Sequence, residues 1–147
     1  MQKRPGIRIL TVTMIFLFSV SMMVSAFAAT YYPNASYYLS FYSATADTGK
    51  SGSVTVNFNV NATRVMDSVG ASYIVVQEYS NGNWKGVGSY FGSTSNGMLA
   101  SDTNSTVGFI TYTGTAGKQY RALVTVYAGK GTGSDSRTVT TNTVTAR

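Results

Sequence analysis

The chain has 147 residues, with 11 Lys and Arg against 5 Asp and Glu, and it contains neither histidine nor cysteine. Lacking those two residue types, it has no Ser-His-Asp or Cys-His catalytic site, no usual zinc site and no disulfide. The five carboxylates lie in or near different turns or strands, so no catalytic acid pair is indicated. We therefore expect a protein that is not an enzyme and that uses no cofactor or metal.

The N-terminal stretch has the pattern of an export signal. Basic residues at positions 3, 4 and 8 precede an apolar run over 9–24, and the small-x-small triplet Ala26-Phe27-Ala28 follows. This pattern predicts a signal peptide over 1–28, helical where it is ordered and cleaved between Ala28 and Ala29. The alternative is a retained membrane anchor, but the uninterrupted apolar core over 14–18 is short compared with the roughly 20 residues that span a bilayer.

Cleavage leaves a small, mildly basic domain. Three basic residues lie in the signal peptide, so 8 basic and 5 acidic residues remain. We expect a flexible mature N-terminus over 29–35 and one domain over 36–147 that is large enough to bury a core. Most of the remaining basic residues lie in the last third. They are either ordinary solvated charges or a contact for an anionic partner such as a cell-wall polymer or a lipid headgroup.

The mature chain is rich in Thr, Val, Tyr and Ser, and turn residues recur about every ten positions, which is typical of an all-β sandwich or barrel. A first strand is expected over 37–46. The clearest strand follows over 53–63, where strict alternation indicates one face on a core and one in water. The residues expected on the core face are Val54, Val56, Phe58, Val60 and Ala62.

The next segments read as a hairpin. Strands are expected over 72–79 and 84–91, and Asn81-Gly82 between them is a strong signal for a tight turn. The stretch 92–104 is weakly patterned and is expected to be a loop, with room for a short edge strand. A further strand is expected over 106–113.

Two strands close the chain, over 118–128 and 136–146. In the last of them Val139 and Val144 are five residues apart, so both can face the core only if a bulge intervenes near Thr141-Asn142. About seven strands joined by short turns predict an antiparallel two-sheet sandwich.

The segment GTAGKQYRALVTVYA over 114–128 resembles the turn and penultimate strand of fibronectin type III and immunoglobulin-like domains. In those domains a tyrosine near the strand start anchors the corner between the sheets through its hydroxyl. The resemblance implies that Tyr120 is such a structural tyrosine corner. The sequence departs from the immunoglobulin pattern in having no cysteine pair and in placing Trp84 just after a hairpin.

The mature chain also resembles a group of small secreted proteins from Gram-positive bacteria. The similarity lies in Met66-Asp67, Gly70-Ala71-Ser72, Asn83-Trp84, the pattern GTAGK-x-Y and the segment GSDSRT. That group has no assigned activity, so the resemblance implies a fold and a compartment rather than a function. We expect a secreted protein, either free or associated with the cell wall.

Aromatic residues are the remaining functional signal. All eleven tyrosines lie after the signal peptide. A tyrosine ring suits stacking against a sugar or protein, although tyrosine is also an ordinary strand residue. The candidate ligand contacts are Tyr31, Tyr32, Tyr38, Tyr42 and Trp84.

Two loops imitate ligand sites. The glycine loop over 129–133 lacks the spacing of a phosphate loop and is followed by a strand, so a hairpin turn is expected. Asp102-Thr103-Asn104 offers oxygens of the kind that calcium takes, but the rest of a calcium loop is absent and turn formation is the simpler interpretation.

The leading hypothesis is therefore a non-catalytic secreted module that binds a ligand or a surface, with a cell-wall polymer, a glycan or a protein as candidate partners. No contact with nucleic acid is expected, and none with membrane except through the signal peptide. The alternatives are a carbohydrate- or cell-wall-binding module that uses exposed Tyr and Trp, and a structural protein that self-associates through unprotected strand edges.

Overall fold

The computed structural model describes residues 36–147. The signal peptide, its cleavage site at Ala28 and Ala29, and the candidate contacts Tyr31 and Tyr32 lie outside the described residues. Over 36–147 the chain forms strands, turns and loops without a helix, and so offers no helix that could cross a membrane. The strands are β1 (Leu39–Thr48), β2 (Ser53–Met66), β3 (Ser68–Ser80), β4 (Asn83–Phe91), β5 (Leu99–Ala100), β6 (Thr103–Thr113), β7 (Gln119–Lys130), β8 (Gly133–Thr140) and β9 (Val144–Thr145).

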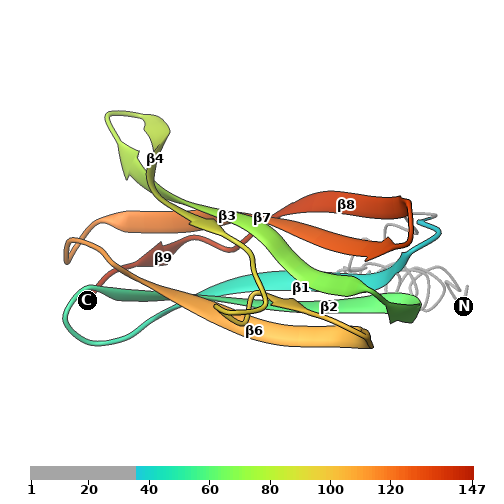
Figure 1. Ribbon diagram of the computed structural model, residues 1–147. Helices are drawn as coiled ribbons and strands as arrows, with labels where there is room; N and C mark the ends of the chain where they lie inside the picture. Colours follow the sequence, from blue (N-terminus) through green and yellow to red (C-terminus); the bar gives the residue numbers. More distant parts are fainter. Residues whose placement is uncertain (1–35) are drawn as a thin grey trace, which may run out of the picture. The chain divides into compact units, whose positions relative to one another are not determined.

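The strands form two sheets packed face to face (Figure 1). Sheet A has the order β1-β2-β6, and sheet B has the order β4-β3-β7-β8, with β5 paired to β3 and β9 paired to β7. Every pairing is antiparallel. The expected all-β, two-sheet antiparallel sandwich is confirmed, and its arrangement is consistent with an immunoglobulin- or fibronectin III-like fold. The expected strands are all present, except that the expected last strand over 136–146 is divided into β8 and β9, and the expected loop over 92–104 contains the short strand β5.

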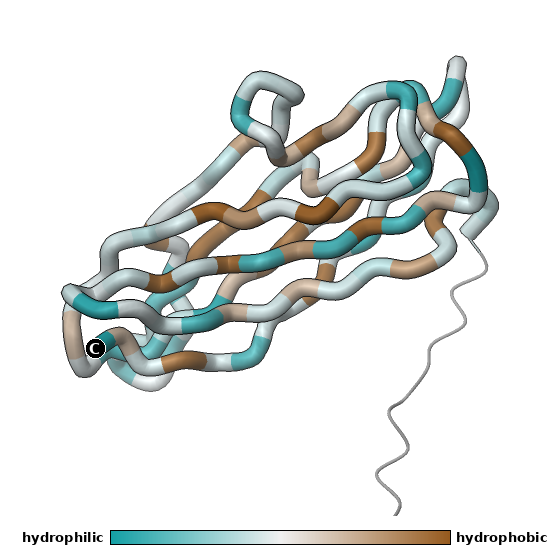
Figure 2. The backbone as a smooth tube through the Cα atoms, turned by 90° about the horizontal axis from the view of Figure 1, so that it is seen from below, coloured by the Kyte–Doolittle hydropathy of each residue, from teal (hydrophilic) through white to brown (hydrophobic). Residues whose placement is uncertain are grey.

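The alternating strand of the sequence is β2, the central strand of sheet A. Figure 2 shows hydrophobic and hydrophilic residues alternating along the strands. The five residues expected on the core face are all buried, whereas the residues between them are partly exposed. Complete burial of a Val or Phe side chain contributes about 1.5–3 kcal/mol to stability. A one-residue slip of register would turn these side chains to solvent and lose most of that contribution.

Strands β3 and β7 form the centre of sheet B and supply the opposite wall of the core. The expected core residues Ile74 and Val76 of β3 are fully buried. The inward row of β7 is also buried and comprises Tyr120, Ala122, Val124, Val126 and Ala128. The two inner faces meet in one cluster that runs the length of the sandwich.

The hairpin between β3 and β4 closes as its sequence indicates. Ser80 pairs with Asn83, which leaves a two-residue turn of Asn81 and Gly82. Both turn residues have positive φ, 52° and 80°. This is the geometry of a type I′ turn, which Asn-Gly favours because both residues tolerate the left-handed region.

The bulge expected in the last strand separates β8 from β9. Thr140 lies opposite Leu123 and Val144 lies opposite Tyr120. Between these two pairs the last strand therefore contains one residue more than β7. The Thr141 hydroxyl accepts a hydrogen bond from the Ala122 N–H at 2.9 Å and so replaces a missing backbone acceptor. The extra residue brings Val139 and Val144 to the same face, opposite Val124 and Tyr120.

Candidate binding face

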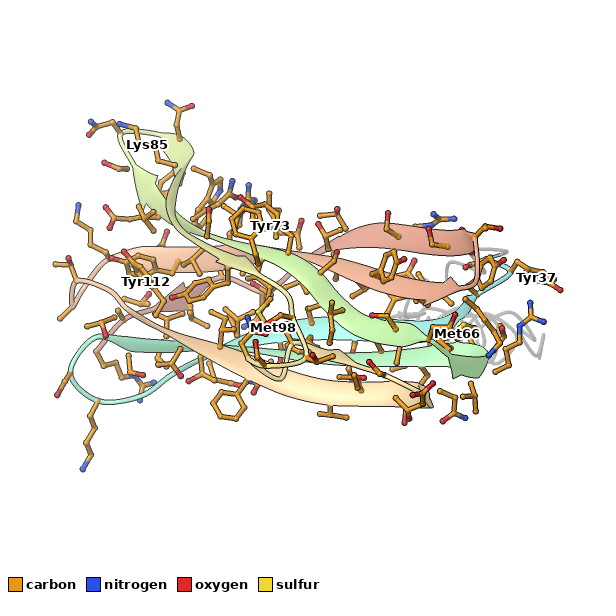
Figure 3. All side chains as sticks on the ribbon, viewed as in Figure 1. Tyr37, Met66, Tyr73, Lys85, Met98 and Tyr112 are labelled. Carbon is orange, nitrogen blue, oxygen red and sulfur yellow. The ribbon has the colours of Figure 1, made fainter. Side chains whose placement is uncertain are left out.

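The candidate ligand contacts that the structure describes do not share one surface. Tyr38 and Tyr42 pack partly against the core. Trp84 lies at the tip of the β3–β4 hairpin, beside Lys85. Figure 3 shows Lys85 and Tyr37, the neighbour of Tyr38, at opposite ends of the domain. Among the described residues, Tyr38, Tyr42 and Trp84 therefore do not form one cluster.

Tyr120 lies between the two sheets and is fully buried. Its hydroxyl accepts a hydrogen bond from the Thr115 N–H at 2.8 Å and donates one to Glu78 Oε2 at 2.7 Å. Burial raises the pKa of Tyr120 above its usual value, and the bond to Glu78 acts in the same direction. The bond to backbone a few residues upstream is the contact of a tyrosine corner. Tyr120 therefore ties the β6–β7 loop to sheet B.

The outer face of sheet B carries exposed aromatic rings arranged in register. Opposite residues on antiparallel strands share a face, so the pairings define rows across the sheet. One row runs Phe91, Tyr73, Thr125 and Thr138, and the next runs Ser89, Val75, Leu123 and Thr140. The last two rows are Gly86, Gln77 and Arg121, then Trp84 and Tyr79. We call these four rows the sheet B face.

Tyr73 and Phe91 form an aromatic platform on this face. Their ring centroids are 4.8 Å apart with the planes tilted by 38°. Phe91 is 74% exposed, while Tyr73 is partly buried and donates its hydroxyl to Ser89 Oγ at 3.1 Å. Figure 3 shows Tyr73 on the side of β3 away from sheet A. The platform is thus open to solvent and its supporting ring is held in place.

The second aromatic pair, Tyr79 and Trp84, is partly covered by another side chain of the protein. Their ring centroids are 5.1 Å apart, and the Arg121 guanidinium lies 4.3 Å from the centre of the Trp84 ring. Arg121 also donates from Nε to Gln77 Oε1 at 2.9 Å, which fixes the guanidinium over the indole. Trp84 therefore has one ring face covered, and it is less available for stacking than Phe91.

A loop over 92–98 borders the Phe91 platform and is held by Asn96. The Asn96 side chain donates to Phe91 O at 2.7 Å and accepts from the Ser93 and Met98 N–H groups at 3.0 and 3.1 Å. Met98 is buried and its carbonyl accepts from Ala71 N–H, so the far end of the loop is anchored in the core. The loop therefore presents a hydroxyl-rich edge, Ser93 to Asn96, in a fixed conformation.

Gly70 allows that anchoring. Its φ is +143°, and a Cβ at this position would collide with the Met98 carbonyl oxygen. Only glycine permits the loop backbone to approach β3 this closely. The position of the loop beside Phe91 thus depends on a residue some twenty positions earlier in the chain.

Four of the five carboxylates have partners inside the domain. Asp47 accepts from Asn57 Nδ2 at 2.8 Å, and Glu78 accepts from Tyr120. Asp67 lies 3.6 Å from Lys130 Nζ and accepts from Gly131 N–H at 2.7 Å. Asp135 accepts from the Ser36 hydroxyl and from Tyr38 N–H, and the Ser36 bond chiefly holds its pKa below the usual value.

Asp102, the acid of the weak calcium candidate, is an exposed turn residue with a φ of 54°. Within residues 36–147, no group of three or more acidic side chains that could hold a metal comes together. The positive φ of Asp102 belongs to a tight bend of the backbone, which agrees with turn formation at Asp102-Thr103-Asn104.

Phe91 and Asn96 were missed by reasoning from sequence. Phe91 looked like the last residue of a strand, and Asn96 like one more polar loop residue. The signal for Phe91 was available, because an apolar residue two positions after a serine on an edge strand shares its exposed face. The role of Asn96 had no local signal, since it depends on where Phe91 O and Met98 N–H lie.

Comparisons with known proteins add no relative to this picture: no family model matches the chain, and neither a curated protein nor a solved structure shows significant similarity to it.

Proposed function

We propose that this chain is a non-catalytic binding module that acts outside the cytoplasm and binds neutral carbohydrate on the sheet B face. The observation that carries the proposal is the exposed Phe91 ring packed on Tyr73. An exposed aromatic side chain held rigidly on a sheet offers an apolar surface that is ready for a sugar ring, with little loss of side-chain entropy on binding.

The polar groups around the platform support a hydroxyl-bearing ligand. The sheet B face places Ser89, Thr125 and Thr138 in or next to the platform rows. The loop Ser93 to Asn96 adds further hydroxyl and amide groups at its border. Hydroxyls and amides both donate and accept hydrogen bonds, which is the chemistry needed to orient a sugar.

The charge on this face favours a neutral ligand over an anionic polymer. Among the four rows the only charged side chain is Arg121, and its guanidinium is already engaged by Trp84 and Gln77. A face built for an anionic polymer would present free Lys or Arg side chains near the aromatic platform. The export signal expected over 1–28 supports an extracellular site of action, where polysaccharides are exposed.

We also propose that the sandwich is of the fibronectin III type and that the chain comes from a Gram-positive bacterium. The strand order β1-β2-β6 facing β4-β3-β7-β8 and the bond from Thr115 N–H to the Tyr120 hydroxyl support the first part. The sequence patterns shared with small secreted bacterial proteins support the second.

The proposal is tested with a Phe91→Ala variant on a glycan array and by co-sedimentation with purified cell wall. We expect binding to a neutral glycan by the unchanged protein and about tenfold weaker binding by the variant, since a lost stacking contact is worth about 1.4 kcal/mol. The matched control is Phe41→Ala, which removes a 48% exposed ring from the outer face of sheet A.

Equal binding by the Phe91→Ala variant and the unchanged protein would remove the sheet B face from the proposal. Failure of the unchanged protein to bind any glycan or wall fraction would overturn carbohydrate binding itself. Circular dichroism of both variants shows whether the fold is kept, and little change is expected because both rings lie on the surface.

A further inference from the structure

Strand β6 forms one edge of sheet A and carries no charged residue. Its eleven residues, Thr103–Thr113, are Thr, Asn, Ser, Val, Gly, Phe, Ile and Tyr. The register with β2 is continuous from Ser53↔Thr113 to Asn61↔Ser105, so the strand has no bulge over that length. A long, uncharged and regular edge strand is the kind that natural proteins usually avoid, because it can pair with another chain.

The backbone of β6 presents unpaired groups at this edge. Gly114 N–H donates to Gly52 O, and the ladder alternates from that pair, so Gly108 and Ile110 bond to β2 while Val107, Phe109 and Thr111 point away. The Tyr90 hydroxyl donates to Thr111 O from the free side at 3.2 Å, which agrees with this alternation. Within residues 36–147 the N–H and C=O groups of Val107 and Phe109 have no partner on that side.

The side chains at the same two positions are apolar and exposed. Val107 is 76% exposed and Phe109 is 65% exposed. Both lie on the outer face of sheet A, opposite Asn59 and Asn57 of β2. The outward residues of β2 opposite them are uncharged. The Asp47 carboxylate that accepts from Asn57 lies on β1, one strand further from this edge.

The other sheet edges carry protective features. Strand β8 has the charged residues Asp135 and Arg137. Strand β4 has Lys85 and a bulge at Val87, where Val76 pairs with Gly88 but Gln77 pairs with Gly86. The edge of β1 is bonded at Ala46 by the side chain of Asn142. Charges, bulges and covering groups are the usual means of blocking edge pairing. Among residues 36–147 none of them lies at Val107 or Phe109, and the Tyr90 hydroxyl covers β6 only at Thr111.

We propose that two copies of this chain associate through antiparallel pairing of their β6 strands about a two-fold axis at Gly108. This register sets Val107 opposite Phe109 of the second copy, and Phe109 opposite Val107. The four unpaired backbone groups of each copy are then used, giving four hydrogen bonds in all. The two sheets A become one six-stranded sheet with a continuous outer face.

The second copy is the occupant because the edge is complementary to itself. The two apolar residues lie symmetrically on either side of Gly108, so a two-fold axis there makes two equivalent aromatic–β-branched pairs. Moving the axis to Phe109 would instead set Val107 opposite Thr111, whose carbonyl already accepts a bond from Tyr90. This inference is independent of the glycan site, which lies on sheet B.

Association is tested by sedimentation and light scattering over a concentration series reaching the millimolar range. The full chain is used, and mass spectrometry identifies the N-terminus of the purified protein. We expect a reversible dimer. A Val107→Pro variant removes a free-edge N–H without removing a bond to β2, so it should remain monomeric. Val107→Thr keeps the N–H and the β-branch and should still dimerise.

A second variant guards against a proline that disturbs the fold. Phe109→Lys places a charge at the paired edge and should also abolish the dimer, while Phe91→Lys places the same charge on an exposed ring position of sheet B and should not. Dimerisation by Phe109→Lys, or a strictly monomeric unchanged protein at millimolar concentration, would overturn the proposal.

The register is tested with cysteines, which the natural chain lacks. Hydrogen-bonded antiparallel pairs have Cα atoms about 5.5 Å apart, within the range that a disulfide bridges. Val107→Cys mixed with Phe109→Cys should therefore cross-link on mild oxidation into a heterodimer. Each variant alone should cross-link far less, and equal cross-linking of the single variants would exclude an axis at Gly108.

Discussion

The two edge strands of sheet A, β1 and β6, differ in how far other parts of the chain bond to their outward backbone groups. On the β1 side, residues from the C-terminal part of the chain reach across and bond the edge backbone. Asn142 pairs with both Ala46 N–H and Ala46 C=O, at 2.8 and 2.9 Å, and Asp135 accepts from Tyr38 N–H at 3.1 Å. On the β6 side, the sheets are joined by Thr106 Oγ1 to Val69 O and by Tyr90 to Thr111 O.

One edge of sheet A thus has its backbone bonded by side chains of the same chain, whereas the other edge leaves backbone groups free for a partner strand. A side-chain amide is a good substitute for a strand, because it carries a donor and an acceptor like a peptide group. The bulge at 141–143 is what turns Asn142 toward β1. Within the described part of the chain no such side chain reaches Val107 and Phe109, so this part of the β6 edge is open to a partner strand.

The largest effect is expected for Asn142→Ala, which opens the closed side. Ala46 is buried, so its N–H and C=O would lose their partners at a cost of about 1–3 kcal/mol. Urea unfolding measures the change in the free energy of unfolding. Thr143→Ala, at the exposed next position, is the control and should change stability little. A loss no greater than that of the control would show that Asn142 does not hold the β1 edge.

A smaller effect that depends on pH is expected for Asp135→Asn. The pKa of Asp135 is below its usual value of 3.8, so its contribution is present above that pH and is lost as the pH falls through the folded pKa. The variant should lose about 1 kcal/mol at neutral pH, since both bonds are partly exposed.

Unfolding of Asp135→Asn followed from pH 7 to pH 2 provides the check. Because the variant lacks this carboxylate, its stability should fall less steeply on the acid side than that of the unchanged protein. Parallel acid curves for the two proteins would assign the acid sensitivity to other carboxylates.

The smallest effect is expected for Tyr90→Phe on the β6 side. The lost bond to Thr111 O is exposed, so water replaces it and the cost should be about 0.5 kcal/mol. Burial, and then the neighbouring Tyr112, raise the pKa of Tyr90. Its contribution is therefore present below pH 10 and is lost as the pH rises above that value.

The Tyr90→Phe variant also sharpens the comparison between the two sides. Its alkaline unfolding curve should be shallower than that of the unchanged protein. It also frees Thr111 O, so dimerisation should be kept or slightly strengthened. A loss of stability as large as that of Asn142→Ala would show that the two sides are equally closed.

Several features of the fold could be predicted because they depend on neighbours in the chain. The alternation in β2, the Asn81-Gly82 turn and the bulge between Val139 and Val144 are each encoded within about a dozen residues. The candidate site was predicted less well. Trp84 was selected for its residue type, but Arg121 and Tyr79 cover it. Phe91 was not selected, although its spacing of two residues from Ser89 places it on the same exposed face of the strand.

The sequence alone determined the strand pattern, the facing of the core strands and the two-sheet class, because period-two burial and turn chemistry act over short distances. Only the tertiary structure decided which edge is closed and which face is aromatic. Asn142 bonds to a residue 96 positions away, and Asp135 to one 97 positions away. Such contacts depend on how the two sheets stack, and no local pattern records that arrangement.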